Sequence, residues 1–132
     1  MICKNKHRAA LICVDWGSTN FRAFLLDAEG ELLDRISSEA GMLKLRQDQF
    51  EPTLMQQIAP WLESGPLPVL MAGMVGSQRG WREASYVDCP ASMYSLTENL
   101  CLVPNEADLN IMIVPGMKGE SFSGQADVMR GE

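Results

Sequence analysis

Residues 10–26 read ALICVDWGSTNFRAFLL, and this stretch decides the fold. Its first part, Ala10 to Val14, is continuously apolar, which is typical of a strand covered on both faces. Residues 15–20 break the run with turn-forming side chains. A second apolar stretch then runs from Phe21 to Leu26. The pattern predicts a buried strand, a tight turn and a second strand.

A helical spacing of apolar residues begins near residue 50. The apolar positions are Phe50, Leu54, Ile58, Trp61 and Leu62. Asp48 and Glu51 resemble a capping box, and Pro52 falls in the first turn, where its missing N–H costs least. Pro60 is expected to end the helix near Ala59 or to kink it. The segment therefore predicts one amphipathic helix.

The remaining elements are shorter. Turn chemistry predicts a hairpin at residues 27–30 and a Gly/Ser-rich loop at residues 118–125. Apolar runs predict strands at residues 31–36, 67–72, 101–104 and 110–115, a short helix at residues 95–100 and the start of a helix at residues 127–132. Three antiparallel-type strands followed by alternating helix and strand predict an α/β fold with a mixed sheet.

Composition limits the classes of function. The 132 residues suit a single domain, and 46% hydrophobic with 21% charged residues exclude a disordered chain or a coiled coil. A net charge of −6 would repel nucleic acids and anionic membranes, so neither is an expected partner. Four scattered cysteines predict reduced thiols, and the apolar run at residues 9–14 is too short for an export signal. A cytoplasmic protein is expected, with residues 1–9 as an N-terminal tail.

The turn between the first two strands carries groups that suit a phosphate. Gly17 permits close approach of the backbone to a ligand, while Ser18, Thr19 and the turn amides can donate to phosphate oxygens. Asp15, fixed at the end of a strand, can hold Mg²⁺ through water, and Arg22 can reach the same anion. The alternative is a turn that only joins two strands. The short motif does not decide between these interpretations.

A second polar loop follows the strand predicted at residues 67–72. Glycines at 73, 76 and 80 allow the loop to close around a small ligand. Ser77 and Gln78 suit sugar hydroxyls, Arg79 or Arg82 can pair with a carboxylate, and Trp81 can wall a pocket. The alternative is a flexible glycine loop with two solvated arginines.

These motifs, taken in order, resemble a known family. Residues 15–30, with Asn20 completing the turn, resemble the first phosphate loop of the sugar-kinase, hexokinase and actin-like ATPase superfamily. More specific similarity to the 2-dehydro-3-deoxygalactonokinase family lies in residues 73–81, including Gly76, and in residues 86–91, 113–116 and 127–132. The similarity covers nearly the whole chain from residue 10.

The resemblance implies a ribonuclease-H-like N-terminal lobe and an activity. That activity is ATP- and Mg²⁺-dependent phosphorylation of 2-dehydro-3-deoxy-D-galactonate at its 6-hydroxyl, in galactonate catabolism. Related sugar kinases carry an acidic residue after a glycine at a helix start, and Gly131-Glu132 resembles that placement. Glu132 is thus the implied general base, and Asp127 is its competitor. Either carboxylate can instead interact with a helix dipole.

The resemblance also implies that residues 10–132 form only the first of two lobes. ATP in this superfamily lies between the lobes, so the chain alone is expected to be inactive. Two alternatives stay open: another sugar or sugar-acid kinase of the superfamily, and a non-catalytic remnant or interaction module. The expected ligands are a sugar acid and ATP, and a homo-oligomer is left open.

Overall fold

The structure is a computed structural model that describes residues 8–89, 92–120 and 126–129. The strands are β1 (Ala9–Trp16), β2 (Phe21–Asp27), β3 (Leu32–Ser38), β4 (Val69–Ala72), β5 (Tyr86–Asp88), β6 (Cys101–Leu102), β7 (Ile111–Ile113), β8 (Gly116–Glu120) and β9 (Ala126–Met129). The helices are α2 (Phe50–Ile58) and α3 (Met93–Glu98), with short 3-10 turns η1 (Gln47–Gln49), η2 (Ala59–Leu62) and η3 (Met74–Gly76).

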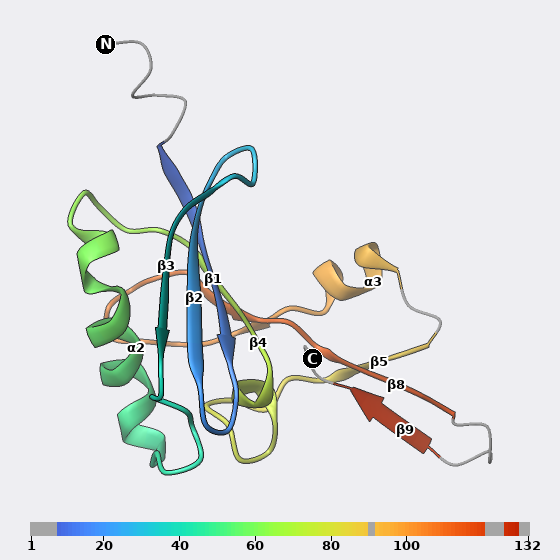
Figure 1. The fold of residues 1–132 in the computed structure, drawn as a ribbon. Coiled ribbons are helices and arrows are strands. Elements are labelled where there is room, and N and C mark those ends of the chain that lie inside the picture. The colour runs from blue at the N-terminus through green and yellow to red at the C-terminus, as the bar shows by residue number, and fades with distance from the viewer. Residues whose placement is uncertain (1–7, 90–91, 121–125, 130–132) are drawn as a thin grey trace.

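The larger sheet has the strand order β3-β2-β1-β4-β7-β6 (Figure 1). Strands β1, β2 and β3 form an antiparallel meander, β4 and β7 run parallel to β1, and β6 returns antiparallel to β7. The predicted α/β fold with a mixed sheet is therefore confirmed. The hairpin prediction also holds, since Gly30 has a φ of 85° and its N–H donates to the Asp27 carbonyl oxygen.

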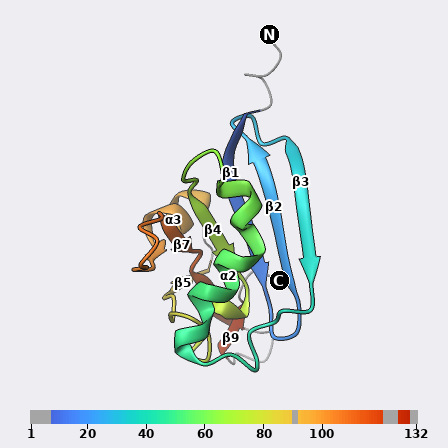
Figure 2. The ribbon, with the colours of Figure 1, turned by 90° about the vertical axis from the view of Figure 1, so that its left-hand side faces the viewer.

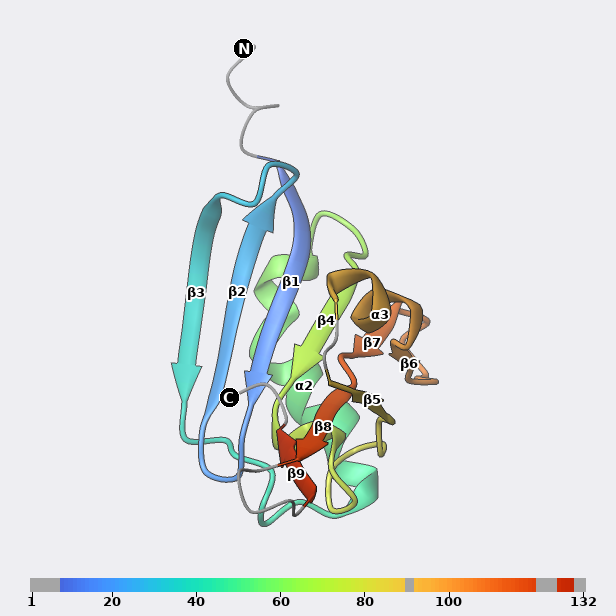
Figure 3. The same ribbon diagram turned by 90° about the vertical axis from the view of Figure 1, so that its right-hand side faces the viewer.

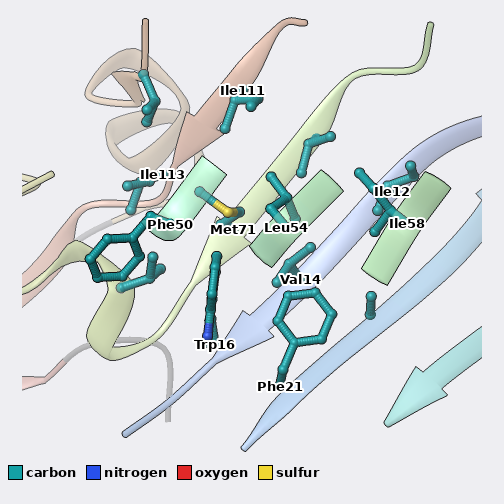
Figure 4. Close-up of a cluster of buried hydrophobic side chains, with 14 of the residues drawn as sticks. Ile12, Val14, Trp16, Phe21, Phe50, Leu54, Ile58, Met71, Ile111 and Ile113 are labelled. Carbon is teal, nitrogen blue, oxygen red and sulfur yellow. The ribbon is translucent and has the colours of Figure 1, made fainter. Parts of the chain in front are cut away.

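Helix α2 covers one face of the sheet (Figures 2 and 3). Its buried side chains Phe50, Leu54 and Ile58 lie in one core with apolar side chains of β1, β2, β4 and β7 (Figure 4). On β1 the core side chains are Ile12, Val14 and Trp16, and the intervening residues are only half-buried. The prediction that both faces of β1 are covered is therefore correct only for the face that packs against α2.

The two ends of α2 differ in how well they were predicted. Pro60 ends the regular helix as expected, and the chain continues as η2 from Ala59 to Leu62. The capping box at the start is wrong, because no side chain caps α2. The Glu51 carboxylate instead accepts hydrogen bonds from the N–H groups of Glu106 and Ala107, at 3.0–3.1 Å. This contact fixes the loop between β6 and β7 to the helix.

Strands β5, β8 and β9 form a separate sheet in the order β5-β8-β9. Two predictions fail here. Residues 118–120, expected in a loop, belong to β8, and residues 127–129, expected to start a helix, belong to β9. Strand β9 pairs antiparallel with β8, with Asp127 opposite Gly119. A helix of so few residues is marginally stable on its own. As a strand paired with β8, residues 127–129 have hydrogen-bond partners for their backbone groups. Glu132 lies outside the described residues.

Candidate functional site: a hairpin turn, its bracing segment and a polar loop

The candidate site lies where the parallel strands β1 and β4 end. The turn after β1 and the loop after β4 lie at the same end of the sheet, at the bottom of Figure 1. The last paired residues of these strands are Asp15 and Ala72, which are register partners. Ligands of open α/β sheets bind outside the carboxyl ends of parallel strands, so a ligand is expected at this edge of the sheet.

Asp15 and Arg22 form an ion pair at this edge. They face each other across the antiparallel pair β1 and β2, and Arg22 Nη2 lies 3.0 Å from Asp15 Oδ2. The Asp15 side chain is 40% exposed and that of Arg22 is 57% exposed, so both remain accessible to a ligand. Two residues predicted to act on one anion are therefore brought together.

The turn itself presents two backbone amides. It is closed by the N–H of Gly17, which donates to the Asn20 carbonyl oxygen at 3.0 Å. Within the described residues, the N–H groups of Ser18 and Thr19 have no hydrogen-bond acceptor. The Asn20 amide donates to Thr19 Oγ1 at 3.2 Å. The turn therefore offers donors of the kind that cradle phosphate oxygens.

A segment that the sequence analysis missed braces this turn. The N–H groups of Met42 and Leu43 donate to the carbonyl oxygens of Gly17 and Ser18, both at 3.0 Å. Gly41 packs so closely on the turn that an added Cβ would overlap backbone atoms of Ser18 and Thr19. We call residues 39–44 the bracing segment. Its only sequence signal is a glycine soon after a strand, which is too weak to identify it.

The turn and the bracing segment border an open hollow of about 450 Å³. Residues 18–20 line it together with Glu39, Gly41, Leu43 and Lys44. Three of the predicted phosphate-loop residues thus lie in a cavity large enough for a small ligand, and they share it with a lysine and a glutamate.

A cluster of aromatic rings supports the turn from the core side. Trp16 is fully buried and makes edge-to-face contacts with Phe21, Phe50 and Trp81, at centroid distances of 5.1, 5.6 and 6.5 Å. The Trp16 indole Nε1–H donates to the Ala40 carbonyl oxygen at 2.9 Å. Trp16 therefore holds both the end of β1 and the start of the bracing segment.

The second predicted loop starts beside Asp15. Gly73 has a φ of 102°, and a Cβ there would lie 3.2 Å from Asp15 Oδ1 and 2.8 Å from the Trp16 carbonyl oxygen. The loop then folds on itself, since the N–H groups of Trp81 and Ala84 donate to the carbonyl oxygens of Val75 and Gly76, both at 2.9 Å. Backbone hydrogen bonds thus hold the loop internally, while Arg79 and Arg82 are exposed, as the alternative of two solvated arginines expected.

The predicted substrate residues of this loop have different surroundings. Gly76 is buried, and the Ser77 hydroxyl donates to the Met74 carbonyl oxygen at 2.6 Å. Trp81 stacks on Phe50 in the aromatic cluster. The exposed polar side chains between Gly73 and Ala84 are Gln78, Arg79, Arg82 and Glu83. Three of them, Gln78, Arg79 and Arg82, were predicted to bind the substrate.

The described residues hold no group of three or more His, Cys, Asp or Glu side chains placed to bind a metal ion directly. None of the helices in the described part of the chain is long and apolar enough to cross a membrane.

Comparisons with known proteins show which family the chain resembles. The profile of the family described as 2-keto-3-deoxy-galactonokinase matches residues 15–132. The chain is 40% identical over 124 residues to the 2-dehydro-3-deoxygalactonokinase of Escherichia coli strain K12, a match covering 94% of this chain and 40% of that relative. It is 32% identical over 119 residues to the "Probable 2-dehydro-3-deoxygalactonokinase DgoK1" of Rhizobium meliloti, covering 90% and 38%.

A solved structure gives the same result for the fold. The crystal structure of a candidate 2-dehydro-3-deoxygalactonokinase from Sinorhizobium meliloti superposes with a TM-score of 0.77 at 32% identity, over 92% of this chain and 39% of that one. The chain thus spans about two fifths of the length of these relatives. The family profile covers most of the chain, including the hairpin turn and the second loop, and the chain belongs to the 2-keto-3-deoxy-galactonokinase family.

Proposed function

We propose that this chain supplies the phosphate loop of an ATP-dependent sugar-acid kinase. The substrate is 2-dehydro-3-deoxy-D-galactonate, which is phosphorylated on its 6-hydroxyl in galactonate catabolism in the cytoplasm. The observation that carries the proposal is the turn after β1, where two amides without acceptors among the described residues adjoin an accessible carboxylate. The family of the chain and the names of its relatives support the same reaction class.

In this proposal the turn binds the phosphates of ATP. The N–H groups of Ser18 and Thr19 donate to phosphate oxygens, and Gly17 leaves the backbone free to approach them. Arg22 holds the Asp15 carboxylate from one side and adds positive charge near the phosphates. Kinases rely on positioning and on neutralisation of phosphate charge, and these residues serve both.

The surroundings of Asp15 fit a magnesium ion held through water. Arg22 pairs with Oδ2, and the Asp15 side chain is 40% exposed, so the carboxylate is open to solvent. A carboxylate oxygen is a ligand type that Mg²⁺ prefers, and Mg²⁺ commonly keeps several of its waters. When bound, the ion would neutralise charge on the transferred phosphoryl group. Asp15 would position it.

The substrate and the base are assigned from the family resemblance. Arg79 or Arg82 is proposed to pair with the substrate carboxylate, beside Ser77 and Gln78. In the transfer step the 6-hydroxyl oxygen forms a bond to the γ-phosphorus while the bond to the β,γ-bridging oxygen breaks. The hydroxyl proton goes to a carboxylate, proposed as Glu132 with Asp127 as the alternative.

We further propose a ribonuclease-H-like lobe that works with a second lobe. An antiparallel β3-β2-β1 meander followed by parallel β4 and β7 supports this fold assignment. The relatives are longer than this chain, which agrees with a catalytic site completed by other residues. Residues 10–132 alone would leave bound phosphates on an open surface, where charge contacts are screened and weak. The chain alone should therefore bind ATP no tighter than millimolar and form no product.

Two experiments test the proposal. First, the gene is read past the codon for Glu132: continuation into a second α/β lobe supports a kinase, and an immediate stop supports a non-catalytic remnant. Second, the complete enzyme is assayed with Mg-ATP and a panel of sugar acids and neutral sugars. Preferred phosphorylation of 2-dehydro-3-deoxygalactonate is expected. Preference for another sugar would assign a different kinase activity, and no transfer to any substrate would contradict the proposal.

A further inference from the structure

The hollow beside the hairpin turn contains chemistry that the proposed phosphate loop does not use. Three exposed side chains, Glu39, Leu43 and Lys44, line it together with the polar turn residues 18–20. Leu43 is 59% exposed and offers an apolar contact in this polar setting. One cation, one carboxylate and one apolar side chain thus face the same cavity as the turn.

Backbone contacts hold the turn and the bracing segment together beside the hollow. Met42 and Leu43 are hydrogen-bonded to the turn carbonyls, and Gly41 packs against the turn backbone without space for a Cβ. Trp16 holds Ala40 from below. A ligand that contacts the turn therefore meets the backbone of the bracing segment in a fixed neighbouring position, because the segment cannot move away without losing these contacts. The exposed Leu43 and Lys44 side chains extend from this backbone.

The charges of the hollow favour one class of ligand. Lys44 offers one cation for an anionic group, and Glu39 offers a carboxylate that can accept hydrogen bonds from hydroxyls. A monoanion with several hydroxyls suits these groups. Its carboxylate can pair with the lysine, and its hydroxyls can bond to the glutamate, Thr19 and Asn20. The exposed Leu43 matches a carbon without a hydroxyl.

We propose that Lys44 binds the carboxylate of the sugar-acid substrate and that Leu43 contacts its 3-deoxy carbon. This inference rests on the proposed kinase function and adds a specificity site to it. In this proposal the bracing segment contacts the substrate beside the phosphate loop. The substrate carboxylate is bound by Lys44 and not by Arg79 or Arg82. The substrate would then lie in the same hollow as the turn that binds the phosphates.

The test uses the complete enzyme and three variants. Lys44→Met removes the charge and keeps the aliphatic chain, and Lys44→Arg keeps the charge. Lys118→Met is the matched control, because Lys118 lies on β8 and pairs with Asp88 at 3.8 Å, outside this hollow. For each protein, KM is measured for 2-dehydro-3-deoxygalactonate and for ATP, and binding of the acid without nucleotide is measured by calorimetry.

We expect Lys44→Met to raise the KM and Kd for the acid about tenfold or more, since a charge-assisted pair is lost. The KM for ATP should stay within about twofold, and Lys44→Arg should restore most of the affinity for the acid. The control Lys118→Met should behave like the unmodified enzyme. Thermal unfolding confirms that each variant is folded.

Other outcomes overturn the inference in distinguishable ways. Unchanged affinity for the acid in Lys44→Met shows that the lysine does not bind it, while normal turnover leaves the kinase function intact. A larger loss for ATP than for the acid assigns Lys44 to phosphate. If the unmodified enzyme binds the acid but transfers no phosphate, the kinase proposal fails, and the calorimetric comparison still decides the role of Lys44. If it does not bind the acid, both proposals fail.

Discussion

The close packing of Gly41 on the hairpin turn makes Gly41→Ala the most informative single substitution. The added Cβ would overlap backbone atoms of Ser18 and Thr19, which cannot rotate away as a side-chain tip could. The bracing segment must therefore separate from the turn. It would then lose the bonds from the Met42 and Leu43 N–H groups to the turn carbonyls.

The size of the effect follows from these two bonds. Each backbone hydrogen bond contributes about 0.5–1.5 kcal/mol net, so their loss costs about 1–3 kcal/mol of unfolding free energy. The smaller entropy of the unfolded alanine chain offsets about 0.4–1 kcal/mol of this loss. For a domain of this length, the melting temperature should fall by roughly 3–5 °C for each net kcal/mol lost.

Gly17→Ala is the matched control. A Cβ at Gly17 would lie 3.9 Å from its nearest neighbour, the Asn20 carbonyl oxygen, which is ordinary van der Waals contact. Its unfolding free energy should stay within about 1 kcal/mol of the unmodified protein. Both variants are measured by thermal and denaturant unfolding, with amide hydrogen exchange at Met42 and Leu43. A Gly41→Ala protein with unchanged stability and unchanged protection of these amides would refute the argument.

Three further predictions concern charged groups. Asp15→Asn should reduce turnover of the complete enzyme by orders of magnitude while leaving the fold intact, because the exposed ion pair that it breaks is worth at most about 1 kcal/mol. Near-normal turnover would show that the turn is only structural. Replacement of Arg79 or Arg82 by Met tests the rival carboxylate site: if either arginine pairs with the substrate, affinity for the acid falls about tenfold or more while ATP affinity hardly changes. Hydrogen bonds from the Trp61 indole and from the backbone lower the pKa of Asp34, so its contribution to stability is present above the unfolded-state pKa and is lost as pH falls through the lower folded-state value. Asp34→Asn should therefore flatten the acid limb of the unfolding free energy against pH, and an unchanged limb would contradict this.

Features set by local sequence were predicted well. The run ALICV predicted β1 because an apolar strand needs no distant partner to be recognised, and the turn chemistry at residues 27–30 placed the β2–β3 hairpin. Pro60 ended α2 for a steric reason that acts within the helix itself. The Asp15–Arg22 pair also follows from local geometry, because a tight turn places these residues opposite each other.

Features that depend on distant contacts were missed. The role of Gly41 arises from packing on a turn more than twenty residues earlier. Glu51 resembles a capping residue in sequence, yet its carboxylate binds amides of the loop after β6. Trp81 was expected to wall a pocket beside the predicted substrate residues. Its ring packs against Trp16 and Phe50, and it lines a different hollow of about 340 Å³ beside the start of α2. Strand β9 could not be recognised without β8 as its partner.

The central claim is that the turn after β1 binds the phosphates of ATP, and NMR titration of backbone amides tests it directly. The chain is labelled with ¹⁵N and titrated with Mg-ATP into the millimolar range, with Mg²⁺ and adenosine alone as controls. The account predicts that the Ser18 and Thr19 amide signals shift with the nucleotide and with neither control, and that Asp15→Asn weakens the response. Unchanged Ser18 and Thr19 signals under saturating nucleotide, in this chain and in the complete enzyme, would contradict it.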